Sequence, residues 1–149
     1  MKKWVLFLCL WAVVALAAVA QNTGADAILG VYHAVQNSDE FKARISKNTD
    51  GTYKIQVIWV KQPVDPKTGM KRLDPKNPDK SLRNVPCDKV VLCNGLKYNA
   101  DKQQWEDAKI YDPQRGLRAN ATLWFEKGQL HVRGSIIGIS ETVRWTKIE

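Results

Sequence analysis

The chain has 149 residues, of which 23 are Lys or Arg and 15 are Asp or Glu, and its formal net charge is +8. A chain of this length can form one domain with a real hydrophobic core, and it is too short for two such domains. Because no long run of like charge occurs, scattered surface lysines that aid solubility are one explanation of the basic character. An affinity for acidic partners, such as lipid headgroups, is the other.

Residues 1–20 have the parts of a bacterial secretory signal peptide. Two lysines precede an apolar run over residues 4–20, which ends in the Ala-Val-Ala pattern that signal peptidase reads. The run is short for a membrane span and polar residues follow it, so an uncleaved anchor is the alternative. We expect cleavage after Ala20 and a periplasmic or secreted domain over residues 21–149 that is soluble after cleavage. In this compartment nucleic acid is not an expected partner.

The rest of the chain consists mainly of short segments in which apolar and polar residues alternate, as in strands. We predict strands near residues 28–35, 41–46 and 53–59, two or three more between 87 and 112, and strands near 117–126, 130–135 and 141–148. In the third segment the alternation groups Tyr53, Ile55, Val57 and Trp59 on one face. About eight antiparallel strands in a small domain close most simply into an up-and-down barrel, because closure removes exposed edges. A flatter sandwich is the main alternative.

Residues 61–87 interrupt this pattern, since they contain five of the six prolines. Proline cannot donate a hydrogen bond inside a sheet, so this segment is predicted to be one long loop. Pairs such as Asp65-Pro66 and Asp74-Pro75 favour turns of defined shape. The segment carries seven Lys or Arg against three Asp. Long loops in compact domains are typically lids or binding loops.

Cys87 and Cys93 are the two cysteines outside the signal segment. In an oxidising compartment a disulfide between them is the default. If the strand-like residues between them were fully extended, the two Cα atoms would lie roughly 20 Å apart, against about 6 Å in a disulfide. A disulfide therefore requires a sharp reversal of the chain, and two buried thiols are the alternative.

Several motifs follow one another along the chain: Gly30-Val31-Tyr32, Trp59-Val60-Lys61-Gln62-Pro63-Val64-Asp65, Asn77-Pro78-Asp79, Leu82-Arg83, Gly95-Leu96, Trp105, Ile110-Tyr111-Asp112-Pro113 with Gly116, Val132-Arg133-Gly134 and Trp145. In this order they resemble the bacterial exported proteins grouped as domain of unknown function 2147 (DUF2147), over nearly all of residues 26–147. The resemblance implies a small calycin-like barrel with no established activity. The family usually has Trp at position 32 and no cysteine near positions 87 and 93.

The first and last predicted strands also resemble the lipocalin arrangement. There a Gly-x-aromatic motif on the first strand lies beneath an arginine from the last strand, and this contact helps to close the barrel. Gly30, Tyr32, Arg144 and Trp145 are the matching residues here. A cation–π contact of this kind is worth roughly 0.5–2 kcal/mol.

Eight residues are candidates for ligand binding: Trp59, Asp65, Asn77, Asp79, Arg83, Tyr111, Asp112 and Arg133. Tyr111 and Asp112 are expected either at a pocket rim or simply in a hairpin turn. Arg133 is expected to bind a carboxylate if its face lines the barrel, and otherwise to face water. The tryptophans either line a cavity or form the core.

The sequence carries no recognisable catalytic constellation. It has no Gly-x-Ser-x-Gly motif, no apparent Cys–His pair and no metal-binding histidine spacing. The acidic residues of the Pro-rich segment lack the bidentate Glu of a calcium loop and are interrupted by lysines. We therefore expect no metal and no cofactor.

These observations favour a binding protein for a small apolar or amphiphilic, lipid-like ligand. Small residues such as Ala119, Ala121 and Gly134 would leave room inside a barrel that large side chains would otherwise fill. The first alternative is an interaction module without a pocket, which uses its basic loop to contact anionic envelope components or a protein. The second is a hydrolase with Asp or Tyr residues at the barrel mouth. Neither the ligand nor the oligomeric state follows from the sequence.

Overall fold

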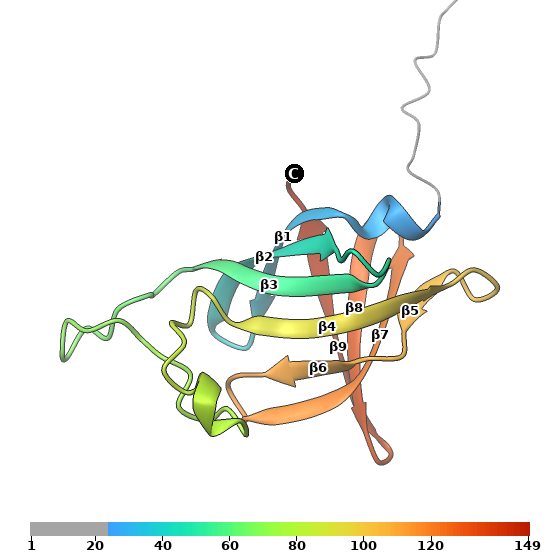
Figure 1. Cartoon of the computed structure of the whole chain (residues 1–149). Helices are drawn as coiled ribbons and strands as arrows, with labels where there is room; N and C mark the ends of the chain where they lie inside the picture. Colours follow the sequence, from blue (N-terminus) through green and yellow to red (C-terminus); the bar gives the residue numbers. More distant parts are fainter. Residues whose placement is uncertain (1–23) are drawn as a thin grey trace, which may run out of the picture.

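The computed structural model describes residues 24–149 as nine antiparallel strands and two short 3₁₀ helices (Figure 1). The strands are β1 Gly30–Gln36, β2 Asp39–Lys47, β3 Tyr53–Val60, β4 Val91–Asn99, β5 Gln104–Glu106, β6 Lys109–Asp112, β7 Leu117–Glu126, β8 Gln129–Ile136 and β9 Ile139–Lys147. The helices are η1 Ala25–Ile28 and η2 Lys80–Leu82. The predicted signal peptide lies outside the described residues. Within residues 24–149, no helix is long and apolar enough to cross a membrane.

The strands form one closed barrel, as the sequence predicts. Each strand from β1 to β4 pairs with the next, β7 pairs with β8 and β8 with β9, and β9 returns to pair with β1. The short strands β5 and β6 both lie between β4 and β7, and the chain between them bends at Asp107, whose φ is 65°. They therefore share one position, and the barrel has eight positions built from nine strands. Between residues 87 and 112 the structure has the three strands β4, β5 and β6, which agrees with the predicted two or three.

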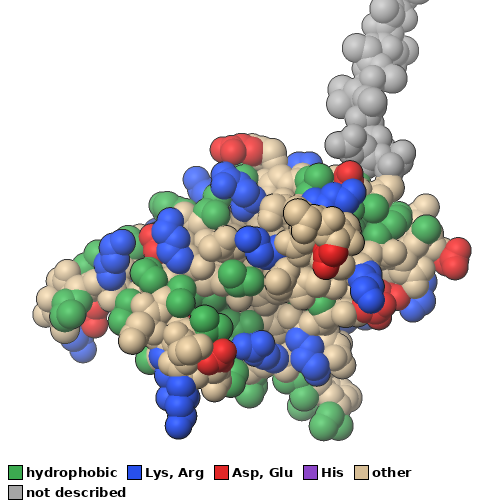
Figure 2. All heavy atoms as spheres, viewed as in Figure 1, with side chains coloured by type: hydrophobic (Ala, Val, Ile, Leu, Met, Phe, Trp, Pro, Cys, Tyr) green, Lys and Arg blue, Asp and Glu red, His purple; other side chains and the backbone are tan. Residues whose placement is uncertain are grey.

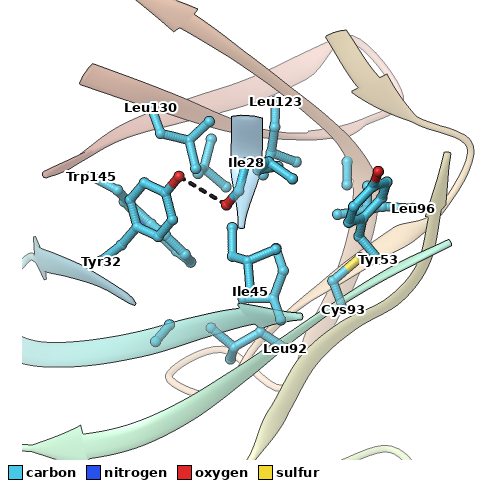
Figure 3. Packing of buried hydrophobic residues seen from close by; sticks show 14 of the residues in the cluster. Ile28, Tyr32, Ile45, Tyr53, Leu92, Cys93, Leu96, Leu123, Leu130 and Trp145 are labelled. Carbon is cyan, nitrogen blue, oxygen red and sulfur yellow. Dashed lines mark hydrogen bonds between the residues drawn. The ribbon is translucent and has the colours of Figure 1, made fainter. Parts of the chain in front are cut away.

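Helix η1 closes one end of the barrel. Ile28 is fully buried there, and its carbonyl oxygen accepts a hydrogen bond of 2.9 Å from the Tyr32 hydroxyl (Figure 3). The indole Nε1 of Trp105 donates to the Ala25 carbonyl at 3.0 Å. Large side chains fill the barrel next to η1, among them Ile45, Tyr53, Leu96, Leu123 and Leu130. The core is thus concentrated at this closed end, which leaves space only toward the other end.

A β-bulge changes the expected face of Trp59. Phe41 pairs with Val60 and Lys42 with Trp59, but Ala43 pairs with Val57, so Ile58 is an extra residue in β3. A bulge of one residue reverses the alternation beyond it. Trp59 therefore lies outside the barrel, where the Lys42 ammonium sits 5.1 Å from the centre of its ring.

The β1–β9 junction contains the residues predicted to close the barrel. Gly30 has a φ of 140°, and a Cβ atom there would collide with the Glu149 backbone oxygen. The ring against Tyr32 is that of Trp145, at a centroid distance of 6.4 Å. Arg144 precedes Trp145 and is exposed on the opposite, outer face. The contact with Tyr32 thus comes from an indole and not from the guanidinium that the lipocalin arrangement suggests.

Cys87 and Cys93 are free thiols in the structure. Cys93 is buried within β4, whereas Cys87 is partly buried in the chain that leads into this strand. The extended backbone from Val91 onward carries Cys93 away from Cys87, and this corresponds to the thiol alternative of the sequence analysis.

Candidate functional site

A cavity of about 1330 Å³ opens at the end of the barrel opposite η1. Its mouth is bordered by the β1–β2, β6–β7 and β8–β9 hairpins and by the Pro-rich loop between β3 and β4. Figure 1 shows the loop and the β8–β9 hairpin extending from the barrel body, away from η1. Because the core fills the η1 end, the cavity opens toward the opposite end of the barrel.

Apolar side chains from most of the barrel strands line the walls of the cavity. They are Phe41, Val57, Val60, Val90, Leu92, Ile110, Ala119, Val132, Val143 and Trp145. Gly134 also lines it, and a Cβ atom at this position would lie 3.1 Å from the Ala119 Cβ and 3.5 Å from the Ile110 Cγ2. Small residues at 119 and 134 thus allow this part of the wall to be close-packed without side chains that extend into the space.

Ion pairs hold two of the cations at the rim. The Lys61 ammonium lies 2.8 Å from the Glu40 carboxylate, which also accepts a contact of 3.0 Å from His33. Lys61 first and His33 second lower the pKa of Glu40. Arg115 lies 2.6 Å from Glu141 and 3.2 Å from Asp112, and its pKa is raised chiefly by Glu141. These pairs join neighbouring elements around the mouth.

A buried polar cluster anchors the Pro-rich loop to the barrel. The Tyr111 hydroxyl donates to Asp74 Oδ1 at 2.7 Å, and Asn77 Nδ2 donates to Asp74 Oδ2 at 2.8 Å. Arg83 Nε donates to the Asn77 carbonyl oxygen at 2.8 Å. Burial first, and then the hydrogen bond to Asp74, raise the pKa of Tyr111. The loop therefore has a defined position at the cavity, as its prolines predict.

The β6–β7 turn also reaches the β1–β2 hairpin across the mouth. Gln114 Nε2 donates to Asp39 Oδ2 at 2.6 Å, and Asn37 Nδ2 donates to Gln114 Oε1 at 2.7 Å. The backbone oxygen of Gln114 accepts a bond of 2.6 Å from Lys76. Gln114 thus links three of the segments that border the entrance.

Comparison with known proteins identifies the family. The profile of the family described as "Uncharacterized protein conserved in bacteria (DUF2147)" matches residues 30–147. The chain belongs to the DUF2147 family.

A solved structure is similar to this DUF2147 chain. It is described as "Protein HP1028 from the human pathogen Helicobacter pylori belongs to the lipocalin family", and it superposes with a TM-score of 0.65 at 19% sequence identity. The match covers 82% of this chain and 83% of that one. At this identity the similarity establishes a lipocalin-like fold and nothing further. No curated protein matches the chain.

The structure brings four of the eight ligand-binding candidates to the cavity of the DUF2147 domain. They are Asp65, Arg83, Tyr111 and Asp112, and Trp145, which was predicted to help close the barrel, lines the cavity as well. Asn77 is buried behind the wall, bonded to Asp74. Asp79 is exposed and accepts a hydrogen bond of 2.9 Å from the Ser81 backbone at the start of η2.

Arg133 lies on the outer face of the barrel. Its guanidinium carbon is 4.8 Å from the centre of the Trp124 ring, and its Nε donates to Thr142 at 3.3 Å. The neighbouring residues Val132 and Gly134 line the cavity, so strand alternation places Arg133 outside. Arg133 is therefore an exposed arginine, which is the second of the two interpretations of this residue.

Several residues of the site were not found from the sequence. Asp74 and Gln114 occur in turn-forming segments, where polar residues are common, and nothing local marks their distant partners. The apolar wall residues Val132 and Val143 do carry a signal, since each alternates with polar neighbours on its strand.

Neither histidine lines the cavity, and burial disfavours the thiolate form of Cys87. Cys87 lines the cavity, but burial raises the pKa of its thiol. His33 pairs with Glu40, and His131 stacks on Trp124 at 5.2 Å on the outer face. Within residues 24–149 no group of three His, Cys, Asp or Glu residues is arranged to hold a metal ion.

Proposed function

We propose that this DUF2147 domain binds a small amphiphilic molecule, with the apolar part inside the barrel and the polar end at the rim. The observation that carries the proposal is the cavity of about 1330 Å³, with its apolar wall and a rim of charged groups. Ligand pockets are typically about 300–1000 Å³, mostly apolar, with a few polar groups that fix orientation. The cavity favours ligand binding over an interaction module without a pocket.

The wall residues support an apolar ligand portion. Val132, Leu92 and Trp145 expose little surface to solvent. The indole nitrogen of Trp145 is the one polar side chain atom among these three residues. Each methylene that moves from water into such surroundings contributes about 0.8 kcal/mol. An alkyl chain is therefore the simplest chemistry that this wall accommodates.

The rim supports an anionic polar end. Among residues 24–149, Lys61 and Arg115 have carboxylate partners, whereas the cavity-lining Arg72 and Arg83 donate to the backbone oxygens of Gln62 and Asn77. The positive charges of Arg72 and Arg83 are therefore available to a ligand. A carboxylate or phosphate would gain charge-assisted hydrogen bonds there.

We propose binding and not catalysis for this cavity. Burial raises the pKa of the Cys87 thiol, which disfavours the nucleophilic thiolate. The Tyr111 hydroxyl is already bonded to Asp74, and neither histidine lines the cavity. The signal-like residues 1–20 support a periplasmic or secreted location for the binding protein.

The experiment is native mass spectrometry together with a matched pair of variants. Protein purified gently from the bacterial periplasm is measured native and then denatured, and dansyl-labelled undecanoic acid is titrated into it. Val143→Trp places an indole in the cavity, while Val35→Trp makes the same change at an exposed position of β1. We expect the wild type and V35W to bind the probe and V143W to lose most of the affinity. Equal binding by V143W and V35W would mean that the probe does not occupy the cavity.

A further inference from the structure

The tip of the β8–β9 hairpin is unusually apolar for a surface turn. It contains Ile136, Ile137 and Ile139, and the last two are 98% and 77% exposed. Ile136 pairs with Ile139, so Ile137 and Gly138 alone form the turn. Figure 2 shows hydrophobic side chains on the projecting end of the molecule where Figure 1 places this hairpin.

Folding does not account for an isoleucine at position 137. Ile137 and Gly138 have φ values of 33° and 76°, which is the backbone of a two-residue turn that favours Asn-Gly. A β-branched residue is strained at positive φ. Its side chain is also almost fully in water, where it contributes nothing to the core. Strain of this kind that packing does not explain points to a functional role.

Other exposed apolar side chains lie at the same end of the barrel. Met70, on the Pro-rich loop, is 70% exposed, and Leu73 and Leu117 are also exposed. These three line the cavity entrance together with Ile136 and Ile139. The turns at the η1 end are polar by contrast, for example Asn48-Thr49-Asp50-Gly51.

Cations accompany this apolar rim. The Pro-rich loop carries Lys67, Lys71, Lys76 and Lys80, all exposed, and its net charge is +4 over residues 61–87. Lys71 and Lys76 line the same entrance as Met70 and Ile136. Figure 2 shows Lys and Arg side chains spread over the surface with hydrophobic side chains between them. Apolar side chains next to lysines are the composition of segments that bind the interface of anionic membranes.

We propose that the cavity mouth docks on a lipid bilayer that contains anionic lipids. The isoleucine tip and Met70 enter the interfacial region, and the lysines of the Pro-rich loop contact the headgroups. The charge of the loop favours this occupant over a second copy of the same chain, since two such basic loops would repel each other. In this orientation an amphiphile would pass between the bilayer and the cavity without crossing water. The docking itself does not require an occupied cavity, and it therefore goes beyond the proposed ligand binding.

The test is flotation of the purified exported protein with vesicles of phosphatidylcholine alone or of phosphatidylcholine and phosphatidylglycerol in equal parts. We expect binding to the anionic vesicles that weakens with added salt. Ile137→Asn introduces a residue that the turn favours, and it is expected to lower the partition constant for the anionic vesicles about tenfold. Ile148→Asn makes the same change at an exposed site near the η1 end and should leave binding unchanged.

Lys67→Gln with Lys71→Gln should weaken binding about fivefold per lysine, and the control pair Lys97→Gln with Lys127→Gln should not.

Several results would overturn the docking proposal. They are wild-type binding that does not depend on phosphatidylglycerol, or equal losses for I137N and I148N. Self-association of the wild type in sedimentation experiments that I137N abolishes, without vesicle binding, would assign the tip to a second copy. V143W separates the two proposals, since it should lose the fatty-acid probe and keep vesicle binding.

Discussion

The hydrogen bond between Tyr111 and Asp74 should be one of the strongest single contributions to the position of the Pro-rich loop. The two residues are 37 positions apart in the chain, and their side chain oxygens are 2.7 Å apart. Asp74 is 2% exposed, so water cannot replace the tyrosine hydroxyl easily. Tyr111→Phe removes this hydroxyl and leaves the packing of the ring intact.

The expected cost follows from the environment of Asp74. Its second oxygen keeps the bond from Asn77, but Oδ1 loses its donor while it stays buried. A hydrogen bond to a charged group is worth about 1.5–3 kcal/mol, and a neutral one about 0.5–1.5 kcal/mol. We therefore expect Tyr111→Phe to lower the free energy of unfolding by about 2 kcal/mol. In an Asp74→Asn background the same change should cost about 1 kcal/mol.

Urea unfolding of the four proteins of this double-mutant cycle measures both values. Limited proteolysis within residues 61–87 should accelerate in Y111F, because the loop is released before the barrel unfolds. Tyr98→Phe removes a hydroxyl from a partly buried tyrosine outside this cluster and is the control. A loss below about 0.5 kcal/mol in Y111F, or an equal loss whether or not the D74N substitution is present, would contradict the argument.

Three further predictions test other parts of the structure. Shortening an alkyl carboxylate ligand by two methylenes should weaken its binding by about 1.6 kcal/mol, or about 14-fold, as measured by competition with the dansyl probe; a flat series would contradict an apolar wall. Burial first, and then its bond to Asp26, raise the pKa of Tyr53 from its ordinary value of 10.0 to about 12. Tyr53 loses its proton at a lower pH in the unfolded chain than in the folded one. The contribution of the protonated Tyr53 to stability should therefore be full below pH 10 and lost as the pH rises through about 12. Urea midpoints in alkaline buffers should fall in the wild type, and they should fall less in Tyr53→Phe. Thiol titration of a chain that begins at residue 21, unfolded without reductant, should find both Cys87 and Cys93, and a count of zero would indicate a disulfide.

The barrel itself was predictable because strand patterns report burial directly. Alternation in the segments of β7, β8 and β9, with turns such as Lys127-Gly128, defined strands long enough to require a partner on each side. The same rule failed at Trp59, since a bulge at Ile58 depends on how β2 and β3 pair and leaves no mark in either strand alone. Alternation gives two faces of a strand, and a single extra residue exchanges them.

The contacts of the site were less predictable than its location. The Pro-rich loop was identified from its prolines and charge, and it does border the cavity. The bonds that hold it join Asp74 to Tyr111 and Lys76 to Gln114 over long separations in sequence. Turn-forming residues such as Asp and Asn have local uses that explain their presence equally well. Only the fold shows which of them are buried and paired.

The residues that folding alone does not explain gather at one end of the molecule. Arg72 and Arg83 keep positive charge at the rim, and Ile137 exposes an apolar side chain in a strained turn. Departures from local folding rules are expected where a protein binds something, because selection there acts on the partner as well as on the fold. At the η1 end the opposite holds, since Ile28, Tyr32 and Trp105 are buried with their hydrogen bonds satisfied. This asymmetry between the two ends makes the open end the place to look for both the ligand and the membrane.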